Sequence, residues 1–159
     1  MEMTQYRPWE KEEVKSIISS SNEKLPILDI QLGGACNLHC IYCDTPKYGF
    51  PCSVNLSAIE KLMKDGDVKW VYVCGLGEPT APANLRHLKQ ILQWCKEKKI
   101  GLSMFSNILN LDKELLDYID NGTLNILFKL DTFKTNRMAY LYGTTIDKAQ
   151  AMKKIIKNY

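Results

Sequence analysis

The chain has 159 residues, the length of one ordinary domain, and 45% of them are hydrophobic, enough for a sizeable core. The formal net charge of +3 is too small to indicate, by itself, a nucleic-acid or membrane surface. The first 13 residues are polar and charged, unlike a signal peptide, and no apolar run approaches the roughly 20 residues that span a bilayer. We therefore expect a cytoplasmic protein that does not insert into membranes.

Residues 1–24 are interpreted as an N-terminal extension, in which an amphipathic helix is expected over 9–20. The remainder, 25–159, is predicted to be one domain in which strands alternate with helices. Strands are expected over 27–32, 68–74, 100–105 and 124–130, and helices over 57–64, 84–99, 112–120 and 147–157. A capping box from Ser57 to Glu60 is expected to start the first of these helices, and Gly101 to cap the end of the second.

This alternation predicts an α/β fold with a parallel sheet and right-handed crossovers. Unusual residues follow each predicted strand: a cysteine-rich loop, then Gly75–Thr80, then Ser106–Asn107, then Lys129 with Asp131. In parallel α/β folds, sites are built at the carboxyl ends of the strands. We therefore expect these four segments to meet at one edge of the sheet.

The cysteine-rich loop carries the strongest chemical signal. Cys36, Cys40 and Cys43 are spaced C-x3-C-x2-C directly after the first predicted strand. In a reducing compartment, such a cluster indicates metal binding or catalysis rather than disulfides, and thiolates suit zinc or iron–sulfur clusters. A structural zinc site would need a fourth ligand, from His39, Cys52 or elsewhere. A 4Fe–4S cluster held by three cysteines would instead leave one iron open to another ligand.

The three cysteines, with the aromatic Tyr42 just before the third, resemble the signature of the radical S-adenosylmethionine (SAM) superfamily. The family's loop follows the first strand of a partial (β/α)6 barrel. The resemblance implies that the cysteines ligate a 4Fe–4S cluster and that the open iron binds SAM. It also implies that one electron, from a donor such as flavodoxin or ferredoxin, cleaves SAM to methionine and a 5′-deoxyadenosyl radical. That radical abstracts a hydrogen atom from the substrate.

A second motif is similar to the family's Gly-Gly-Glu-Pro sequence, which binds the methionine amino group. Gly77, Glu78 and Pro79 follow the second predicted strand, although Leu76 stands where the family has its first glycine. Gly75 keeps the turn flexible, and Glu78 with nearby carbonyls would supply acceptors for an ammonium group.

Weaker resemblances concern the side chains after the third and fourth strands. Ser106 and Asn107 resemble residues that contact ribose or carboxylate, with helix capping as the alternative. Lys129 and Asp131 share one face of a strand and would hold a carboxylate and a ribose hydroxyl, or pair with each other. Tyr42 is expected to flank the adenine.

The other candidates favour ordinary structural roles. His39 is expected to be a solvated loop residue. Cys74 and Cys95 are expected in the core, because free cysteine is commonly buried as a small hydrophobe. Cys52 alone makes no second cluster site.

The resemblance accounts for four of the family's six strand–helix units. The last predicted strand, 124–130, is thus expected to leave an apolar edge that must be covered. A fragment or split polypeptide, the N-terminal extension or another subunit would each explain it, and a naturally minimal fold is a fourth explanation.

Three functions follow from these residues. The leading hypothesis is a radical SAM enzyme, with a preference for peptide or protein substrates because an open half barrel admits a chain-like molecule. The rival is a non-catalytic zinc or iron–sulfur module completed by a partner chain. An RNA-modifying radical SAM enzyme is the third, because similar Gly-x-Gly-Glu-Pro variants occur in RNA-methylating members, although no concentrated basic face is evident here.

Overall fold

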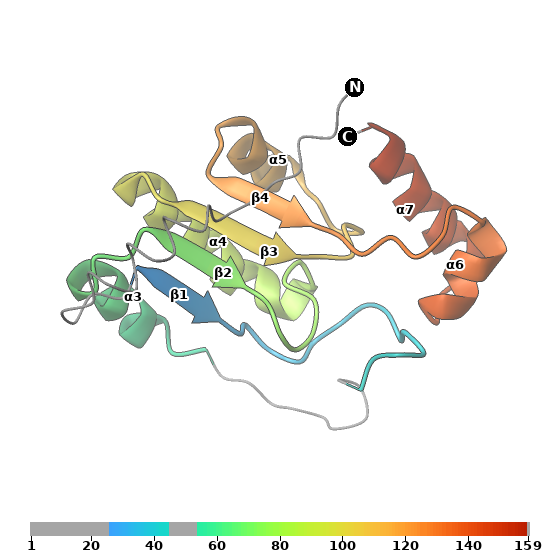
Figure 1. Ribbon diagram of the computed structural model, residues 1–159, viewed down its shortest axis with the longest axis horizontal. Helices are drawn as coiled ribbons and strands as arrows, with labels where there is room; N and C mark the ends of the chain where they lie inside the picture. The colour runs from blue at the N-terminus through green and yellow to red at the C-terminus, as the bar shows by residue number, and fades with distance from the viewer. Residues whose placement is uncertain (1–25, 45–53, 159) are drawn as a thin grey trace, which may run out of the picture.

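Four parallel strands form the centre of the molecule. The computed structural model describes residues 26–44 and 54–158, so the helix expected over 9–20 and Cys52 lie outside the described residues. The strands β1 (Ile27–Ile30), β2 (Trp70–Val73), β3 (Gly101–Phe105) and β4 (Leu124–Leu127) pair in the order β1-β2-β3-β4 (Figure 1). The predicted α/β fold is confirmed, as an open four-stranded sheet rather than a closed barrel.

The register of the sheet aligns the carboxyl ends of the strands. Ile30 of β1 lies opposite Val73 of β2, and Val73 lies opposite Met104 of β3. Phe105, the last residue of β3, lies opposite Leu127, the last residue of β4. The loops that leave the strands therefore start from one edge, as predicted from the order of the elements.

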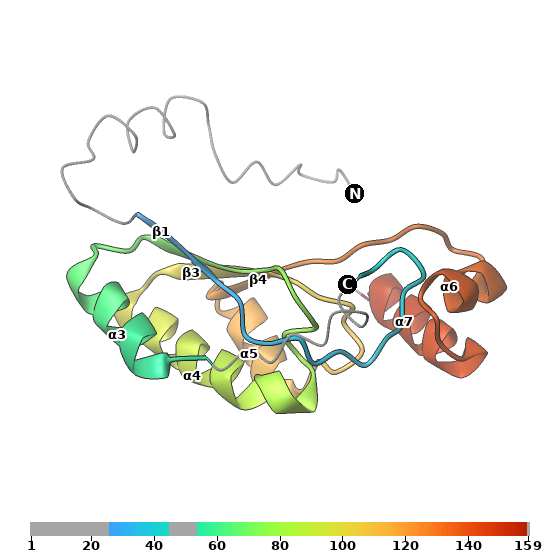
Figure 2. The same ribbon diagram turned by 90° about the horizontal axis from the view of Figure 1, so that it is seen from below.

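Three helices cover one face of this sheet. They are α3 (Leu56–Asp65), α4 (Pro82–Lys98) and α5 (Lys113–Asp120), and Figure 2 shows them together below the strands. Their apolar faces and the strands bury one cluster, whose fully buried members include Val71, Leu88, Ile91, Leu102 and Leu115. Cys95 belongs to this cluster, as predicted, and burial raises the pKa of its thiol to about 12.

The predicted capping box at the start of α3 is wrong. The cap is Asn55, whose Oδ1 accepts a hydrogen bond from the Ala58 amide at 3.0 Å. Ser57 donates its hydroxyl to the same oxygen at 2.8 Å, and Glu60 pairs with Lys64 one turn later. Asparagine and serine are about equally good N-caps, so both Asn55 and Ser57 could start the helix. In the structure Asn55 does so, two positions earlier than predicted.

The predicted glycine cap of α4 is also wrong. Lys99 adopts the left-handed conformation that ends the helix, with φ of 56°, while Gly101 already starts β3. The chain must change direction directly after Lys98, because only two residues separate α4 from β3. The left-handed residue is therefore fixed by chain geometry at a position where the sequence supplies lysine instead of glycine.

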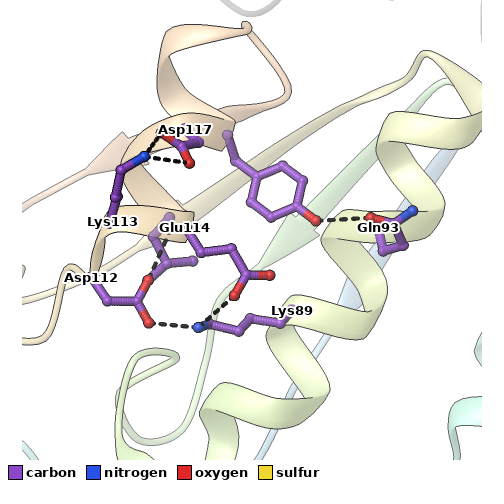
Figure 3. Close-up of polar contacts among 8 residues, drawn as sticks. Lys89, Gln93, Asp112, Lys113, Glu114 and Asp117 are labelled. Atoms are coloured by element: carbon purple, nitrogen blue, oxygen red, sulfur yellow. Dashed lines mark hydrogen bonds and ion pairs between the residues drawn. The ribbon is translucent and has the colours of Figure 1, made fainter.

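An ion-pair cluster joins α4 to the start of α5 (Figure 3). The Nζ atom of Lys89 lies 2.5 Å from Oδ2 of Asp112 and 2.8 Å from Oε2 of Glu114. Asp112 also caps α5, because its Oδ1 accepts a hydrogen bond from the Leu115 amide at 3.0 Å. These bonds, to Asp112 first and then to Glu114, raise the pKa of Lys89. The cluster holds α4 beside α5 below the strand ends.

Two helices follow β4, where the sequence predicted one. They are α6 (Thr135–Leu141) and α7 (Ile146–Asn158), which lie beyond the carboxyl ends of the strands in both views (Figures 1 and 2). They enclose a second apolar cluster, formed by Leu38, Met138, Ala139, Tyr142, Ala149 and Met152. One member, Leu38, comes from the cysteine loop, so the helix pair packs directly on that loop.

Three further expectations concern the exterior of the fold. Within the described residues, no strand pairs with the outer edge of β4, as the predicted open edge requires.

Cys74 is partly exposed rather than in the core, and its thiol donates a hydrogen bond to Asp29 at 3.2 Å. None of the described helices has the length and apolar character needed to cross a bilayer.

Replacing Lys99 with glycine should stabilise the protein. Glycine adopts the left-handed conformation without the steric cost that lysine incurs, so Lys99→Gly should raise the free energy of unfolding by about 1 kcal/mol. For a chain of this size, thermal unfolding should then move up by about 2–4 °C. Lys98→Gly, at the last residue of α4, is the matched control and should lower stability rather than raise it, by up to about 1 kcal/mol. A lower melting temperature for Lys99→Gly would contradict the assignment of the cap.

Candidate cofactor-binding site

A cavity of about 190 Å³ lies where the loops after the four strands meet α7 and the residue that ends α6. Nine of the residues predicted from the sequence line it: Cys36, Cys40, Tyr42, Cys43, Gly77, Glu78, Ser106, Asn107 and Lys129. Asp131 lies next to it, in contact with Tyr42 and Lys129. Gly75 instead lines a small neighbouring cavity of about 40 Å³ with Cys74. The segments expected to meet at one edge therefore do meet.

The entry of the cysteine loop is fastened to the loop after β2. The Glu78 amide donates to the Ala35 carbonyl at 2.8 Å. Gly77 is pressed against the same stretch with φ of +77°, and a Cβ there would lie only 2.6 Å from the Ala35 oxygen. Glycine is therefore required at this position for both its conformation and its size.

Asn84, in the first turn of α4, holds the same two loops together. Its buried Nδ2 lies within hydrogen-bond distance of three carbonyl oxygens: Glu78 at 2.8 Å, Ala35 at 3.2 Å and Gly33 at 3.3 Å. The sequence placed Asn84 only at the start of a helix. The sequence does contain a signal for this role. Asn84 is a polar residue on the apolar side of that helix, and a buried amide needs hydrogen-bond partners.

The Glu78 carboxylate joins the loop after β2 to the end of β3. It is 3% exposed. Its Oε1 accepts hydrogen bonds from the Thr80 amide at 3.0 Å, the Thr80 hydroxyl at 2.7 Å and the Ser106 hydroxyl at 2.7 Å. Its Oε2 accepts one from the Asn107 amide at 2.7 Å. Four donors occupy most of the acceptor capacity of a carboxylate, which favours a bracing role for this side chain.

Ser106 and Asn107 extend this network toward the cysteines. The Ser106 hydroxyl accepts from the Ile108 amide at 2.9 Å, so both its donor and an acceptor site are used within the fold. Asn107 Nδ2 donates to Oδ1 of Asn37 at 2.6 Å, and Asn37 directly follows Cys36. The end of β3 thereby contacts the loop beside its first thiol.

The three thiols are arranged around the cavity rather than around one point. Among the described residues, no three His, Cys, Asp or Glu side chains converge closely enough to hold a single metal ion. The Leu38 amide lies 3.5 Å from the Cys36 sulfur and donates to it. Partial desolvation is the main cause that raises the pKa of Cys36 and of Cys40, so binding iron would release protons. A soft three-thiol set facing a cavity with room for a further ligand fits an iron–sulfur cluster.

Tyr42, Lys129 and Asp131 form a contact group on the far side of the cavity. The Lys129 ammonium lies 3.6 Å from the centroid of the Tyr42 ring and 3.5 Å from the Asp131 carboxylate. The Tyr42 hydroxyl donates to that carboxylate at 3.1 Å. Burial, then the neighbouring Cys40 and Asp131, raises the pKa of Tyr42, which keeps its donor proton in place. The predicted alternative, a pairing of Lys129 with Asp131, is therefore present.

The exit of the cysteine loop is fastened to the end of α6. The His39 amide donates to the Tyr142 carbonyl at 3.2 Å, and the Ile41 amide donates to the Leu141 carbonyl at 3.0 Å. The His39 side chain itself is exposed, as expected of a loop residue. These contacts have no local signal in the sequence, because they join segments about a hundred residues apart.

Residues 30–159 match the model of a protein family described as the radical SAM superfamily. Crystal structures of SuiB from Streptococcus suis are similar in fold: one described simply as SuiB (20% identity, TM-score 0.64), one bound to S-adenosylmethionine (19%, 0.65) and one bound to the precursor peptide SuiA (21%, 0.63). The similarity covers 86%, 90% and 93% of this chain but 31%, 34% and 34% of those chains, about a third of their length. No similar protein was found among curated proteins.

Exchanging the Glu78 carboxylate for an amide should destabilise the fold without any ligand present. In Glu78→Gln, an amide NH2 replaces one of the two acceptor oxygens and faces the donors that this oxygen accepted, which leaves buried donors unpaired and should cost roughly 2–3 kcal/mol of unfolding free energy. Denaturant unfolding of the iron-free chain measures this loss of stability, with Glu97→Gln, at an exposed position on α4, as the control. Equal stability of the two variants would show that the Glu78 side chain is not a brace.

Proposed function

Since the chain belongs to the radical SAM superfamily, we propose that it holds a 4Fe–4S cluster on Cys36, Cys40 and Cys43 and cleaves SAM reductively. The observation that carries this proposal is the shared cavity. It brings the three thiols together with the polar loops after β2 and β3 and with Lys129 after β4. The match of the family to residues 30–159 supports the same assignment.

The chain's own residues would divide the work of binding SAM. Lys129, the only cationic side chain among the described residues that line the cavity, would bind the carboxylate of the methionine part. Backbone carbonyls held in place by Gly77 and Asn84 would accept the ammonium group, while the Glu78 carboxylate braces them. The partly exposed ring of Tyr42 would flank the adenine.

When bound and reduced, the cluster supplies one electron that cleaves SAM to methionine and a 5′-deoxyadenosyl radical, which takes a hydrogen atom from the substrate. An electron donor such as flavodoxin or ferredoxin would restore the reduced state. In this proposal residues 25–159 form the catalytic domain, residues 1–24 are an extension to it, and a partner chain or second copy would cover the edge of β4.

Peptides or proteins are the proposed substrate class. Within the described residues the four strands form an open sheet rather than a closed barrel, which suits a chain-like substrate better than an enclosed small molecule. SuiB, which shares the fold, has been crystallised with its precursor peptide SuiA.

Loss of one cysteine should abolish both the cluster and the reaction. After anaerobic reconstitution, the parent chain should contain iron and sulfide and, with dithionite and SAM, form 5′-deoxyadenosine. Cys40→Ala should retain neither iron nor activity, because two thiolates cannot hold the cluster in place. Cys95→Ala, at the buried cysteine of α4, is the matched control and should retain both.

Metal analysis separates this proposal from the non-catalytic alternative. Stoichiometric zinc without iron or sulfide after anaerobic purification would favour a structural module. A parent chain that holds the cluster yet forms no 5′-deoxyadenosine would contradict catalysis.

The substrate class is tested by stimulation of SAM cleavage. The fraction of source-cell extract that contains peptides below about 10 kDa (the size of a short precursor peptide) should raise 5′-deoxyadenosine formation above the rate without substrate, and prior proteinase treatment should remove the effect. Total RNA from the same cells should not stimulate. Stimulation by RNA that is lost after ribonuclease treatment would favour the RNA-modifying alternative instead.

A further inference from the structure

The turn that ends α6 contacts the cysteine loop through both backbone and side chain. Its carbonyls at 141 and 142 accept the Ile41 and His39 amides, the two that flank Cys40. Leu38, which lies between the first two cysteines, is 3% exposed and packs among the buried residues of α6 and α7. Cys40 itself packs against the same cluster.

Gly143 brings this turn unusually close to the loop. Its φ is +54°, in the left-handed region. A Cβ on Gly143 would overlap the carbonyl oxygen of His39 and would lie 2.6 Å from the carbonyl carbon. Both atoms belong to the backbone, so a larger residue could be accommodated only by moving the loop between Cys36 and Cys40, or the turn.

Tyr142 ties the same turn to the segment after β4. Its hydroxyl donates to the Lys129 carbonyl at 2.7 Å and accepts from the Asp131 amide at 3.3 Å. The ring is 2% exposed and meets the Tyr42 ring edge-on, with the centroids 6.4 Å apart. One buried side chain therefore fixes the position of Tyr42, next to Cys43, relative to Lys129.

The entry and exit of the loop are thus held by different parts of the chain. Cys36 lies near the entry, which the loops after β2 and β3 hold through Glu78 and Asn107. Cys40 and Cys43 lie at the exit, where the contacts come from α6 and α7. The relative position of the three thiols then depends on the turn between those two helices.

We propose that the Tyr142–Gly143 turn is a positioning element that fixes Cys40 and Cys43 and thereby the geometry of the cluster. The inference rests on the proposed function, because it assumes that these thiols hold a 4Fe–4S cluster. The turn would act on the cluster through the loop whose backbone it holds, as the outer-shell partners of a metal site do.

The test compares two glycine-to-alanine substitutions with the same conformational cost. Gly143→Ala adds a methyl group against the His39 carbonyl, whereas Gly122→Ala, at φ of +77° after α5, meets no atom within 4 Å. Gly143→Ala should lose more thermal stability than Gly122→Ala, because the overlap with the His39 carbonyl adds to the conformational cost that both variants share. Gly143→Ala alone should lose iron affinity by about tenfold or more, the size typical of substitutions beside metal ligands. It should also shift the electron paramagnetic resonance spectrum and the midpoint potential of the reduced cluster.

A second readout needs neither iron nor activity. In the iron-free chain, Cys40 and Cys43 should be alkylated several-fold faster in Gly143→Ala than in the parent or Gly122→Ala, while buried Cys95 stays unmodified in all three. Tyr142→Phe is the milder variant, since it removes only the hydroxyl and leaves the carbonyl that accepts from His39. This variant should fold, and its Cys43 should also be alkylated faster than Cys43 of the parent chain.

The outcomes separate the two proposals. A parent chain without iron and sulfide overturns the proposed function, and the alkylation rates then still decide whether the turn fixes the two cysteines. A parent chain with the cluster, and a Gly143→Ala variant equal to Gly122→Ala in iron affinity, spectrum and alkylation rates, overturns the inference alone.

Discussion

The buried carboxylate of Glu78 is the interaction on which the site depends. Its two oxygens accept four hydrogen bonds from Thr80, Ser106 and Asn107, so this side chain joins the loops after β2 and β3. Its backbone amide holds the cysteine loop at Ala35. A carboxyl group so deeply buried is tolerated only because donors surround it, and Oε2 depends on the single donor that it has in the Asn107 amide. The rigidity of the strand ends is therefore gained through one side chain that does not itself need to touch a ligand.

In an open sheet, the cysteine loop is not surrounded by a closed ring of strands and helices, so other contacts must hold it. Here the cysteine loop is held at two ends by unrelated means. At its entry the contacts are hydrogen bonds from β2, β3 and α4, and at its exit they are the backbone bonds and apolar packing of α6 and α7. The helix pair after β4 thus packs against the loop through Leu38 and the Tyr142–Gly143 turn. This arrangement explains how four strand–helix units bring all three thiols to one cavity.

The features that could be predicted from the sequence were those with local signals. The strands followed from β-branched and aromatic runs, and the convergence of Cys36, Glu78 and Lys129 followed from parallel topology. The helix α6 could not be predicted, because it is short and buries only Met138 and Ala139, which gives no periodic pattern. The roles of Asn84, Tyr142 and Gly143 were missed because each acts through contacts about fifty to a hundred residues away in the chain. The Asn55 and Lys99 caps were misassigned because closely spaced alternatives compete for a helix end, and only the chain geometry decides between them.

The contacts that hold the cysteine loop come from distant parts of the chain. Leu38 is buried among residues of α6 and α7, and two backbone hydrogen bonds join the loop to the end of α6. Near its start, the loop accepts the Glu78 amide through the Ala35 carbonyl. The loop is therefore ordered by the tertiary fold rather than by its own sequence, and the conformational entropy cost of ordering it is part of the cost of folding the domain. For the proposed cluster, thiols held in this way would leave more of the metal–thiolate free energy for affinity, because less of it would offset the ordering of the loop.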